Sequence, residues 1–187
     1  MAETRRHRVR SPNRGAAVMG AAVMGAVLLG TLVAAGPLRA EEDGTSGLPV
    51  PRFVSLKADK VNVRNGPGKD HDVAWVFKRA GLPVEVTAEY ETWRRIRDAD
   101  GAEGWVYHSM VSLRRTALVA PWQKQGETVP LRDGPSADAR LVAKLEPGVL
   151  GAVKSCDGKF CRIVGDGFDG YVVETQLFGV YPNEKLD

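Results

Sequence analysis

The chain is poor in the residues that catalysis and metal binding most often require. Its 187 residues include only two cysteines and three histidines. A zinc site needs a cluster of Cys, His or carboxylate ligands, and covalent catalysis needs a nucleophile, a base and an orienting group that converge. The nearest approach is His71 within Lys69–Asp72, which we interpret as a solvated loop. We therefore predict no enzyme: no catalytic residue, no metal site and no cofactor.

A basic excess is also missing once the first 40 residues are set aside. Residues 1–40 hold six arginines and one glutamate, whereas the rest of the chain has 20 basic and 22 acidic residues. The basic character of the whole sequence therefore belongs to its N-terminal segment. Nucleic-acid binding relies on a basic surface, so we expect no nucleic-acid partner.

The N-terminal segment has the pattern of an export signal. Five arginines precede an apolar stretch at 15–36, and Ala40 stands just before the acidic run Glu41–Asp43. Small residues at this place suit cleavage by a signal peptidase, which predicts a periplasmic protein. The apolar stretch is also long enough to span a bilayer. An uncleaved inner-membrane anchor, facing the periplasm and making the only membrane contact, is the alternative.

No stretch after residue 40 has the period of an amphipathic helix, but one segment occurs twice. Val61–Gly68 returns as Val129–Ser136, and Gly104-Trp105-Val106 is answered by Gly170-Tyr171-Val172. The offset is 68 residues at the first pair and 66 at the second, which fits a duplicated small domain. Short strand-like runs separated by Gly, Pro, Asn and Asp predict a small, partly open β-barrel in each copy.

The predicted fold class is all-β, with two tandem small β-barrels after the signal. The expected parts are a signal peptide or anchor at 1–40, a flexible linker at 41–52, the first barrel at 53–115, the second at 116–182 and a tail at 183–187. In the first barrel we expect strands at Lys60–Arg64, Ala74–Lys78, Pro83–Ala88, Trp93–Asp98 and Gly104–Tyr107. Short 3₁₀ turns at His108–Met110 and Glu174–Gln176 should precede last strands at Val111 and Leu177.

The two cysteines stand on either side of a turn signal. Cys156 and Cys161 flank Asp157-Gly158-Lys159-Phe160, and Asp-Gly between strand-like runs is a strong hairpin signal. In an oxidising compartment they should form a cross-strand disulfide. The first copy has Glu89 and Arg94 at these places, which would form a cross-strand ion pair. A redox-active pair is the alternative, but the spacing is Cys-x4-Cys and no βαβ pattern surrounds it.

Aromatic residues crowd the first copy and supply the candidate ligand groove. Strand alternation places Trp93, Arg95 and Arg97 on one face, opposite a core position at Ile96. An aromatic floor beside a guanidinium could hold a peptide carboxylate or a Pro-rich segment. Alternatively, Trp105 belongs to the core and the arginines are merely solvated. The groove candidates are Tyr90, Trp93, Arg95, Trp105 and Tyr107.

A second set of residues recurs in both copies and is interpreted as structural. An arginine precedes each Gly-Pro turn, and its guanidinium should tie that turn to the barrel. The residues are Arg64, Gly66 and Pro67 in the first copy and Arg132, Gly134 and Pro135 in the second.

These motifs carry a resemblance to a known family. The run Asn-Val-Arg-x-Gly-Pro, followed by Trp-Arg-x-Ile and Gly-Trp-Val, resembles the bacterial SH3 domain (SH3b) and is similar to a proteobacterial SH3-like subfamily of exported proteins. The resemblance covers 53–182. The second copy departs from it, with Pro130, Phe160 and Tyr171 in place of Asn, Trp and Trp. The resemblance implies a non-catalytic binding module for cell-wall peptide or for protein segments.

Two functions follow as expectations. The first is an exported, non-catalytic module that recognises peptidoglycan or a periplasmic protein segment, with the second barrel as support or as a second weak site. The alternative is a structural or assembly subunit of an envelope protein complex. That alternative predicts an exposed hydrophobic patch on the second barrel, formed by Leu177, Phe178, Val180 and Tyr181.

Overall fold

The computed structural model describes residues 42–43 and 45–187. The expected export signal lies outside these residues. Everything described below belongs to the unit Arg39–Asp187. Within the described residues, no helix has the length and apolar character needed to cross a membrane.

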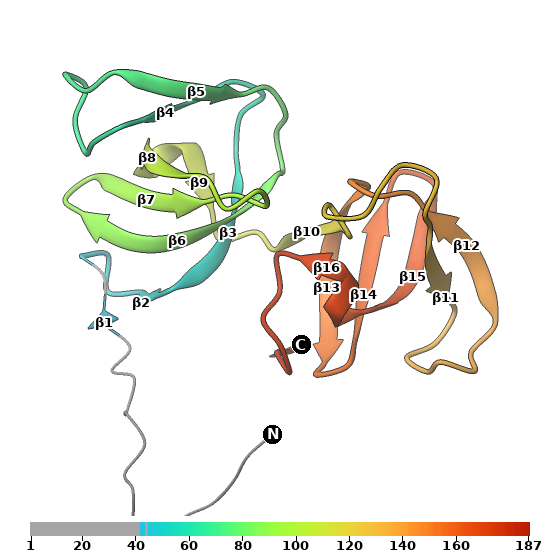
Figure 1. Ribbon diagram of the computed structural model, residues 1–187. Helices are drawn as coiled ribbons and strands as arrows, with labels where there is room; N and C mark the ends of the chain where they lie inside the picture. Colours follow the sequence, from blue (N-terminus) through green and yellow to red (C-terminus); the bar gives the residue numbers. More distant parts are fainter. Residues whose placement is uncertain (1–41, 44) are drawn as a thin grey trace, which may run out of the picture. The chain divides into compact units, whose positions relative to one another are not determined.

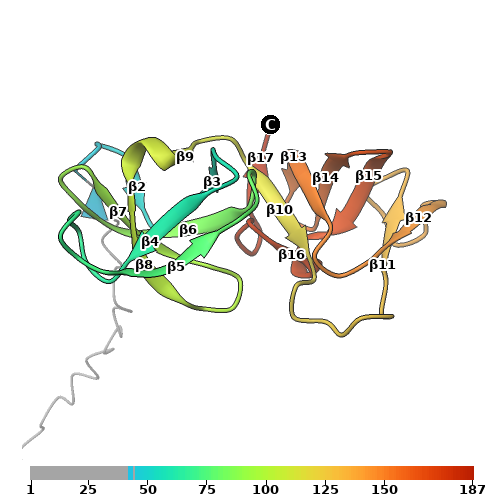
Figure 2. The ribbon, with the colours of Figure 1, turned by 90° about the horizontal axis from the view of Figure 1, so that it is seen from above.

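Nearly all strands of the described residues belong to two antiparallel sheets, which repeat the same strand order (Figure 1). The first runs β5-β4-β8-β7-β6-β3-β9 and the second β12-β11-β15-β14-β13-β10-β16, with β17 added beside β13. Figure 2 shows the edge strand β12 next to β11 in the second barrel. The all-β prediction of two tandem barrels is confirmed.

The strands of the first barrel are β3 (Arg52–Leu56), β4 (Val61–Arg64), β5 (Val73–Phe77), β6 (Pro83–Tyr90), β7 (Trp93–Arg97), β8 (Glu103–Tyr107) and β9 (Val111–Ser112). Those of the second are β10 (Thr116–Val119), β11 (Val129–Arg132), β12 (Leu141–Leu145), β13 (Leu150–Asp157), β14 (Phe160–Gly165), β15 (Phe168–Val173), β16 (Leu177–Phe178) and β17 (Lys185–Leu186). A short pair, β1 (Glu42–Asp43) and β2 (Pro49–Val50), precedes them. The expected 3₁₀ turns occur at His108–Met110 and Glu174–Gln176.

Each barrel encloses its own core, built by period-2 alternation along the strands. In the first, Val61, Val63, Ile96 and Val106 are fully buried, while Asn62 between the two valines is exposed. The second core is formed by Val119, Leu131, Cys161, Ile163 and Val172, among others. The alternation on β4 and β11 therefore turns every second side chain outward, where a ligand can reach it.

Two equivalent glycines let each barrel close. A Cβ on Gly104 would lie 2.5 Å from Val63 Cγ1, and a Cβ on Gly170 would lie 2.5 Å from the Arg132 carbonyl oxygen. Real Cβ atoms do not approach so closely, so only glycine fits. The following residues, Trp105 and Tyr171, pair with Arg64 and Arg132. The recurring Gly-aromatic motif thus joins β8 to β4 and β15 to β11.

Segments at both ends of the two barrels make specific contacts. In the segment expected to be a flexible linker, Ser46 N–H donates to Glu89 at 2.6 Å. In the expected tail, Asn183 N–H donates to the buried Glu174 at 2.7 Å, and β17 pairs with β13. Parts of both segments therefore pack on the barrels.

The barrels contact one another through aromatic rings and hydrogen bonds. Phe53 packs against Phe178 and Tyr181, with ring centroids 5.3 and 4.7 Å apart. The Thr116 hydroxyl donates to the Gly81 carbonyl at 2.7 Å, and the Tyr181 hydroxyl donates to Glu85 at 2.9 Å. The hydrophobic patch that we expected to be exposed on the second barrel is thus largely used inside the molecule. Its other two members, Leu177 and Val180, are buried.

Candidate functional site

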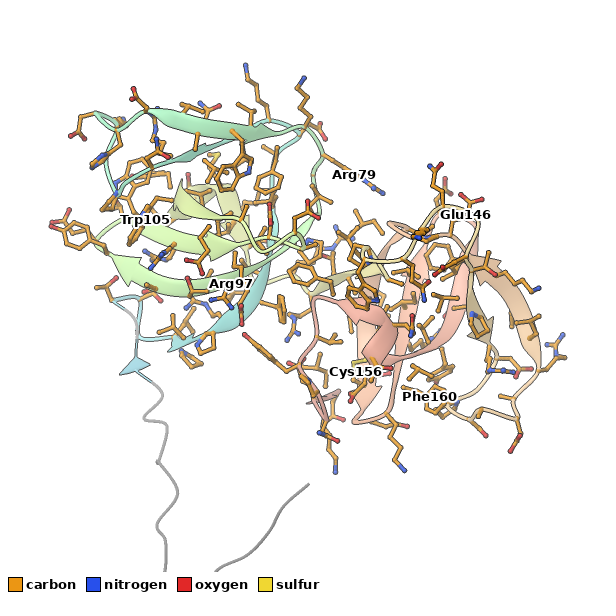
Figure 3. The ribbon with its side chains drawn as sticks, in the orientation of Figure 1. Arg79, Arg97, Trp105, Glu146, Cys156 and Phe160 are labelled. Atoms are coloured by element: carbon orange, nitrogen blue, oxygen red, sulfur yellow. A yellow bond between two sulfur atoms is a disulfide. The ribbon has the colours of Figure 1, made fainter. Side chains whose placement is uncertain are left out.

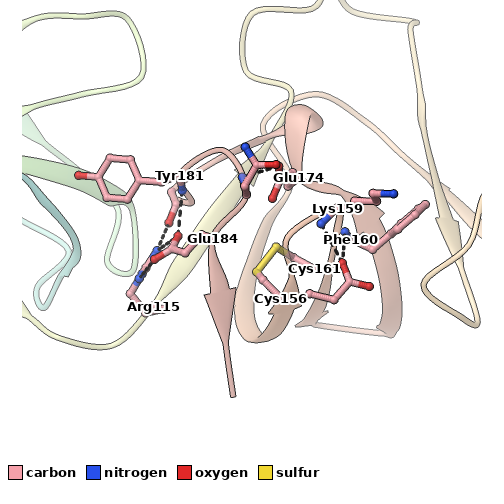
Figure 4. Close-up of a disulfide and its surroundings, with 11 residues drawn as sticks. Arg115, Cys156, Lys159, Phe160, Cys161, Glu174, Tyr181 and Glu184 are labelled. Atoms are coloured by element: carbon pink, nitrogen blue, oxygen red, sulfur yellow. Dashed lines mark hydrogen bonds and ion pairs between the residues drawn. A yellow bond between two sulfur atoms is a disulfide. The ribbon is translucent and has the colours of Figure 1, made fainter. Parts of the chain in front are cut away.

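The two cysteines form a disulfide across the β13–β14 hairpin (Figure 4). Cys156 and Cys161 face each other in the strand register, and both are buried. The turn between them is held by Asp157, whose carboxylate accepts the backbone N–H groups of Lys159 and Phe160 at 2.8 Å each. These hydrogen bonds lower the pKa of Asp157. The disulfide predicted from the sequence is confirmed, and such bonds persist in oxidising compartments outside the cytoplasm.

The first barrel has an ion pair at the same place. Glu89 and Arg94 are paired in register, and Arg94 Nε lies 2.9 Å from Glu89 Oε1. The Glu89 side chain is fully buried and also accepts hydrogen bonds from Arg52 and Ser46. Burial raises the pKa of Glu89, but the hydrogen bonds from Arg52 and Ser46 outweigh it and bring the pKa down to about 2. The two barrels thus close equivalent hairpins with different chemistry.

A groove of about 380 Å³ opens on the outer face of the first barrel. It combines three cationic side chains with two aromatic rings, an amide and a thioether, and no carboxylate of the described residues lines it. We call it the cationic groove. Its lining residues are Lys60, Asn62, Arg64, Lys69, Trp93, Tyr107 and Met110.

The aromatic part of the cationic groove comes from β7 and β8. Trp93 and Tyr107 are directly opposite in the register and pack edge to face, with centroids 5.6 Å apart. Trp93 is 8% exposed and Tyr107 is 37% exposed. The sequence led us to expect a part-exposed Trp93, but the ring is mostly packed and reaches the groove at its edge. Tyr107 is the accessible aromatic surface.

Arg64 belongs both to the groove and to the turn beside it. Its guanidinium donates to the His71 carbonyl oxygen at 2.6 Å. The equivalent Arg132 donates to the Ala139 carbonyl oxygen, also at 2.6 Å. His71 packs so closely over Gly66 that a Cβ there would lie 2.5 Å from the imidazole ring. Each arginine therefore ties its loop to the barrel, and in the first barrel it also lends its charge to the groove.

Three of the five expected groove residues lie outside the cationic groove. Arg95 forms an ion pair with Glu103 at 2.6 Å, and its counterpart Arg162 does the same with Asp169. Trp105, labelled in Figure 3, is half-buried and faces Arg95 across the strands. Tyr90 is 52% exposed on the outer surface, away from the lining. The structure therefore joins Trp93 and Tyr107 of the expected set, without Arg95, Trp105 or Tyr90.

Lys60, Asn62 and Lys69 of the groove were not expected from the sequence, and Arg64 was expected only as a residue that holds a turn. Lys60 and Asn62 flank the buried Val61, so strand alternation alone places both on the outer face. Lys69 comes from the loop that Arg64 holds. Strand alternation could have identified the first two, but not the loop residue, because its position depends on how the loop folds back.

Among residues 42–43 and 45–187, no group of three Cys, His, Asp or Glu side chains is arranged to hold a metal ion. What the cationic groove can do chemically is bind an anion: ammonium and guanidinium groups donate charge-assisted hydrogen bonds to carboxylates, and the aromatic edge offers apolar contact.

A family model described as the bacterial SH3 domain matches residues 57–112 and 125–179, one match in each barrel. Among solved structures, NlpC2 from Trichomonas vaginalis is 15% identical with a TM-score of 0.32, and the alignment covers 68% of this chain and 48% of that one. NlpC1 from the same organism is 15% identical with a TM-score of 0.31, and the alignment covers 68% of this chain and 45% of that one. This chain thus spans about half the length of either protein.

The CBD of the endolysin LysPBC5 is 18% identical with a TM-score of 0.28, and the alignment covers 67% of this chain and 90% of that one. No curated protein matches the sequence.

Proposed function

The chain belongs to the bacterial SH3 domain family, and from this premise we propose that it is an exported, non-catalytic binding module whose first barrel recognises carboxylate-bearing cell-wall peptides. The observation that carries the proposal is the cationic groove. Lys60, Arg64 and Lys69 surround an aromatic edge formed by Trp93 and Tyr107.

The chemistry of the groove favours a peptide with free carboxylates. Lys60 and Lys69 are exposed, so each contributes modestly and in a salt-dependent way. Tyr107 adds apolar contact that salt does not weaken. Stem peptides of peptidoglycan carry several carboxylates, and the CBD of an endolysin is among the structures found. We expect weak binding to a single stem and stronger retention on a polymer that presents many.

The proposed compartment is the periplasm. The disulfide and the arginine-rich, apolar N-terminal sequence both support export. Whether the segment is cut after Ala40 or kept as an inner-membrane anchor, the barrels would face the same side.

The alternative, a structural subunit of an envelope complex, predicted an exposed hydrophobic patch on the second barrel, and the residues of that patch are instead packed within the molecule. Phe178 and Tyr181 pack on Phe53 of the first barrel, and Leu177 and Val180 are buried. A periplasmic protein segment remains the alternative ligand for the cationic groove.

Co-sedimentation with purified peptidoglycan sacculi tests the proposed function. The unit Arg39–Asp187 should pellet with sacculi, and retention should fall several-fold between about 50 and about 500 mM salt without vanishing. The variant Lys60→Glu/Lys69→Glu should lose about tenfold in affinity because two attractive charges become repulsive.

The matched control is Lys78→Glu, an exposed lysine of the same barrel that lies outside the groove lining. It should pellet as the unmodified protein does. Because the control reverses one charge and the double variant two, a loss of binding free energy in the control about half as large as in the double variant would show attraction by net charge alone. No pelleting of the unmodified protein would favour the protein-segment alternative.

A further inference from the structure

The second barrel has a groove at the position of the cationic groove. Its volume is about 310 Å³. Apart from Gln123, its lining comes from elements equivalent to those of the first barrel: the start of β11 with the residue before it, the end of β15 and the following 3₁₀ turn. We call it the neutral groove. It is lined by Gln123, Thr128, Val129, Pro130, Val173, Thr175 and Gln176.

Aligned residues of the two grooves differ systematically in charge. Thr128 stands in place of Lys60, Pro130 of Asn62, Val173 of Tyr107 and Gln176 of Met110. Three of the seven lining residues of the cationic groove are charged, whereas none of the seven here is. A carboxylate entering this groove would lose water without gaining a cation, which is unfavourable. The second groove therefore suits a different, uncharged ligand.

A longer loop supplies a lining residue that the first barrel lacks. The backbone N–H of Lys57 donates to Met110 and that of Ala120 to Gln176, each at 2.8 Å, so these positions correspond. In the first barrel the next core valine, Val61, comes four positions after Lys57. In the second barrel the equivalent Val129 comes nine positions after Ala120. The extra residues include Gln123, whose N–H closes a turn on the Ala120 carbonyl at 2.9 Å.

This loop places an unpartnered acceptor in the neutral groove. Gln123 Nε2 donates to Gln176 Oε1 at 3.0 Å, but Gln123 Oε1 is buried and has no hydrogen-bond partner among the described residues. A buried acceptor without a donor is costly, so its presence at a groove points to a ligand that donates. The same groove also has accessible apolar surface, since Val173 is 38% exposed.

We propose that the neutral groove binds an uncharged peptide segment. A main-chain N–H of that segment donates to Gln123 Oε1, and a small apolar side chain packs on Pro130 and Val173. An uncharged sugar is the less suitable occupant, because none of the lining residues offers an aromatic ring to its C–H face. This inference rests on the second barrel alone and does not depend on what the cationic groove binds.

The test uses a blocked peptide, N-acetyl-Ala-Val-Ala N-methylamide, followed by NMR on the unit Arg39–Asp187. We expect it to shift the side-chain amide signals of Gln123 and Gln176 and the methyl signals of Val173, with a dissociation constant of about 1 mM. The affinity should not change between about 50 and about 500 mM salt, since no charge is involved. The absence of these shifts, or strong salt dependence, would overturn the proposal.

Variants separate this site from the cationic groove. Gln123→Leu should weaken the blocked peptide about tenfold, because the acceptor is gone. Gln125→Leu, in the same loop but outside this lining, is the matched control, and Lys60→Glu/Lys69→Glu should also leave the affinity unchanged. Equal affinity of the Gln123→Leu variant, or shifts produced by N-acetylglucosamine oligomers and not by the peptide, would contradict the assignment. The mapping on the unmodified protein decides the matter even if Gln123→Leu does not fold.

Discussion

Glu89 forms an ion pair with Arg94 at the place where the second barrel has its disulfide. It is a buried carboxylate at the position where the second barrel has Cys156, and it also accepts hydrogen bonds from Arg52 and from the segment at Ser46. A buried charge is tolerated only when it is paired and hydrogen-bonded. Glu89 therefore holds together both the β6–β7 hairpin and the chain that enters the barrel.

Glu89→Gln should lower the free energy of unfolding by about 3 kcal/mol near neutral pH, because it leaves two arginines without their carboxylate. Since the folded pKa of about 2 lies below the ordinary value of 4.5, this contribution is complete above about pH 5 and is lost as the pH falls toward 2. The variant should therefore show a flatter loss of stability over that range. Urea denaturation at several pH values measures both effects.

Glu91→Gln, on the exposed turn of the same hairpin, is the control and should behave as the unmodified protein. An unchanged stability of Glu89→Gln at neutral pH, together with an unchanged acid profile, would show that Glu89 is not the acid-sensitive group.

At the scale of the elements, the two hairpins are equivalent in register but closed differently. Cys156–Cys161 joins β13 to β14 where Glu89 and Arg94 join β6 to β7. A disulfide stabilises mainly by restricting the unfolded chain, and the loop closed here is short. Its contribution therefore lies at the lower end for disulfides.

The double variant Cys156→Ala/Cys161→Ala should unfold with a free energy lower by about 2 kcal/mol. Reducing the unmodified protein with dithiothreitol should give a loss of the same size, which urea denaturation would show. Neither change should affect ligand binding in the first barrel, because the disulfide lies in the second. A variant as stable as the oxidised protein would mean that the disulfide adds nothing to the fold.

Most elements were predictable because their signals are local. The alternation at Val61 and Val63 and the Asp-Gly turns at Asp100 and Asp157 can be recognised from adjacent residues alone, without knowing which segments pack against them. β3 was missed because nearly all its residues are buried, which removes the alternation: Phe53 packs on the second barrel, and the Ser55 hydroxyl meets that of Ser112. Whether such a segment forms a strand depends on the strands with which it pairs, and the local sequence does not show them.

The candidate site was only partly predictable for the same reason. Strand alternation placed Arg95 on the outer face with Trp93, but it could not show that Glu103 lies across the strand and pairs with it. Nor could it show that a loop brings Lys69 to the groove. Which arginine or lysine is available to a ligand depends on contacts between strands and loops that lie apart in the sequence.

At the scale of the whole molecule, duplication has produced two barrels with the same topology and different grooves. Their contact is polar as well as aromatic: Glu85 accepts the Tyr181 hydroxyl at 2.9 Å and pairs with Arg97 at 3.3 Å. Burial, followed by the hydrogen bond to Glu85, raises the pKa of Tyr181 well above its ordinary value. The hydroxyl thus stays protonated and able to donate.

The most direct measurement is a calorimetric titration of the unit Arg39–Asp187 with a synthetic wall stem peptide, in its free-acid form and with every carboxylate amidated. The free acid should bind about tenfold tighter at low salt, this advantage should shrink as salt rises, and Lys60→Glu/Lys69→Glu should remove it. Equal affinity for the two forms would mean that the cationic groove contributes nothing to recognition, which would contradict the proposed function.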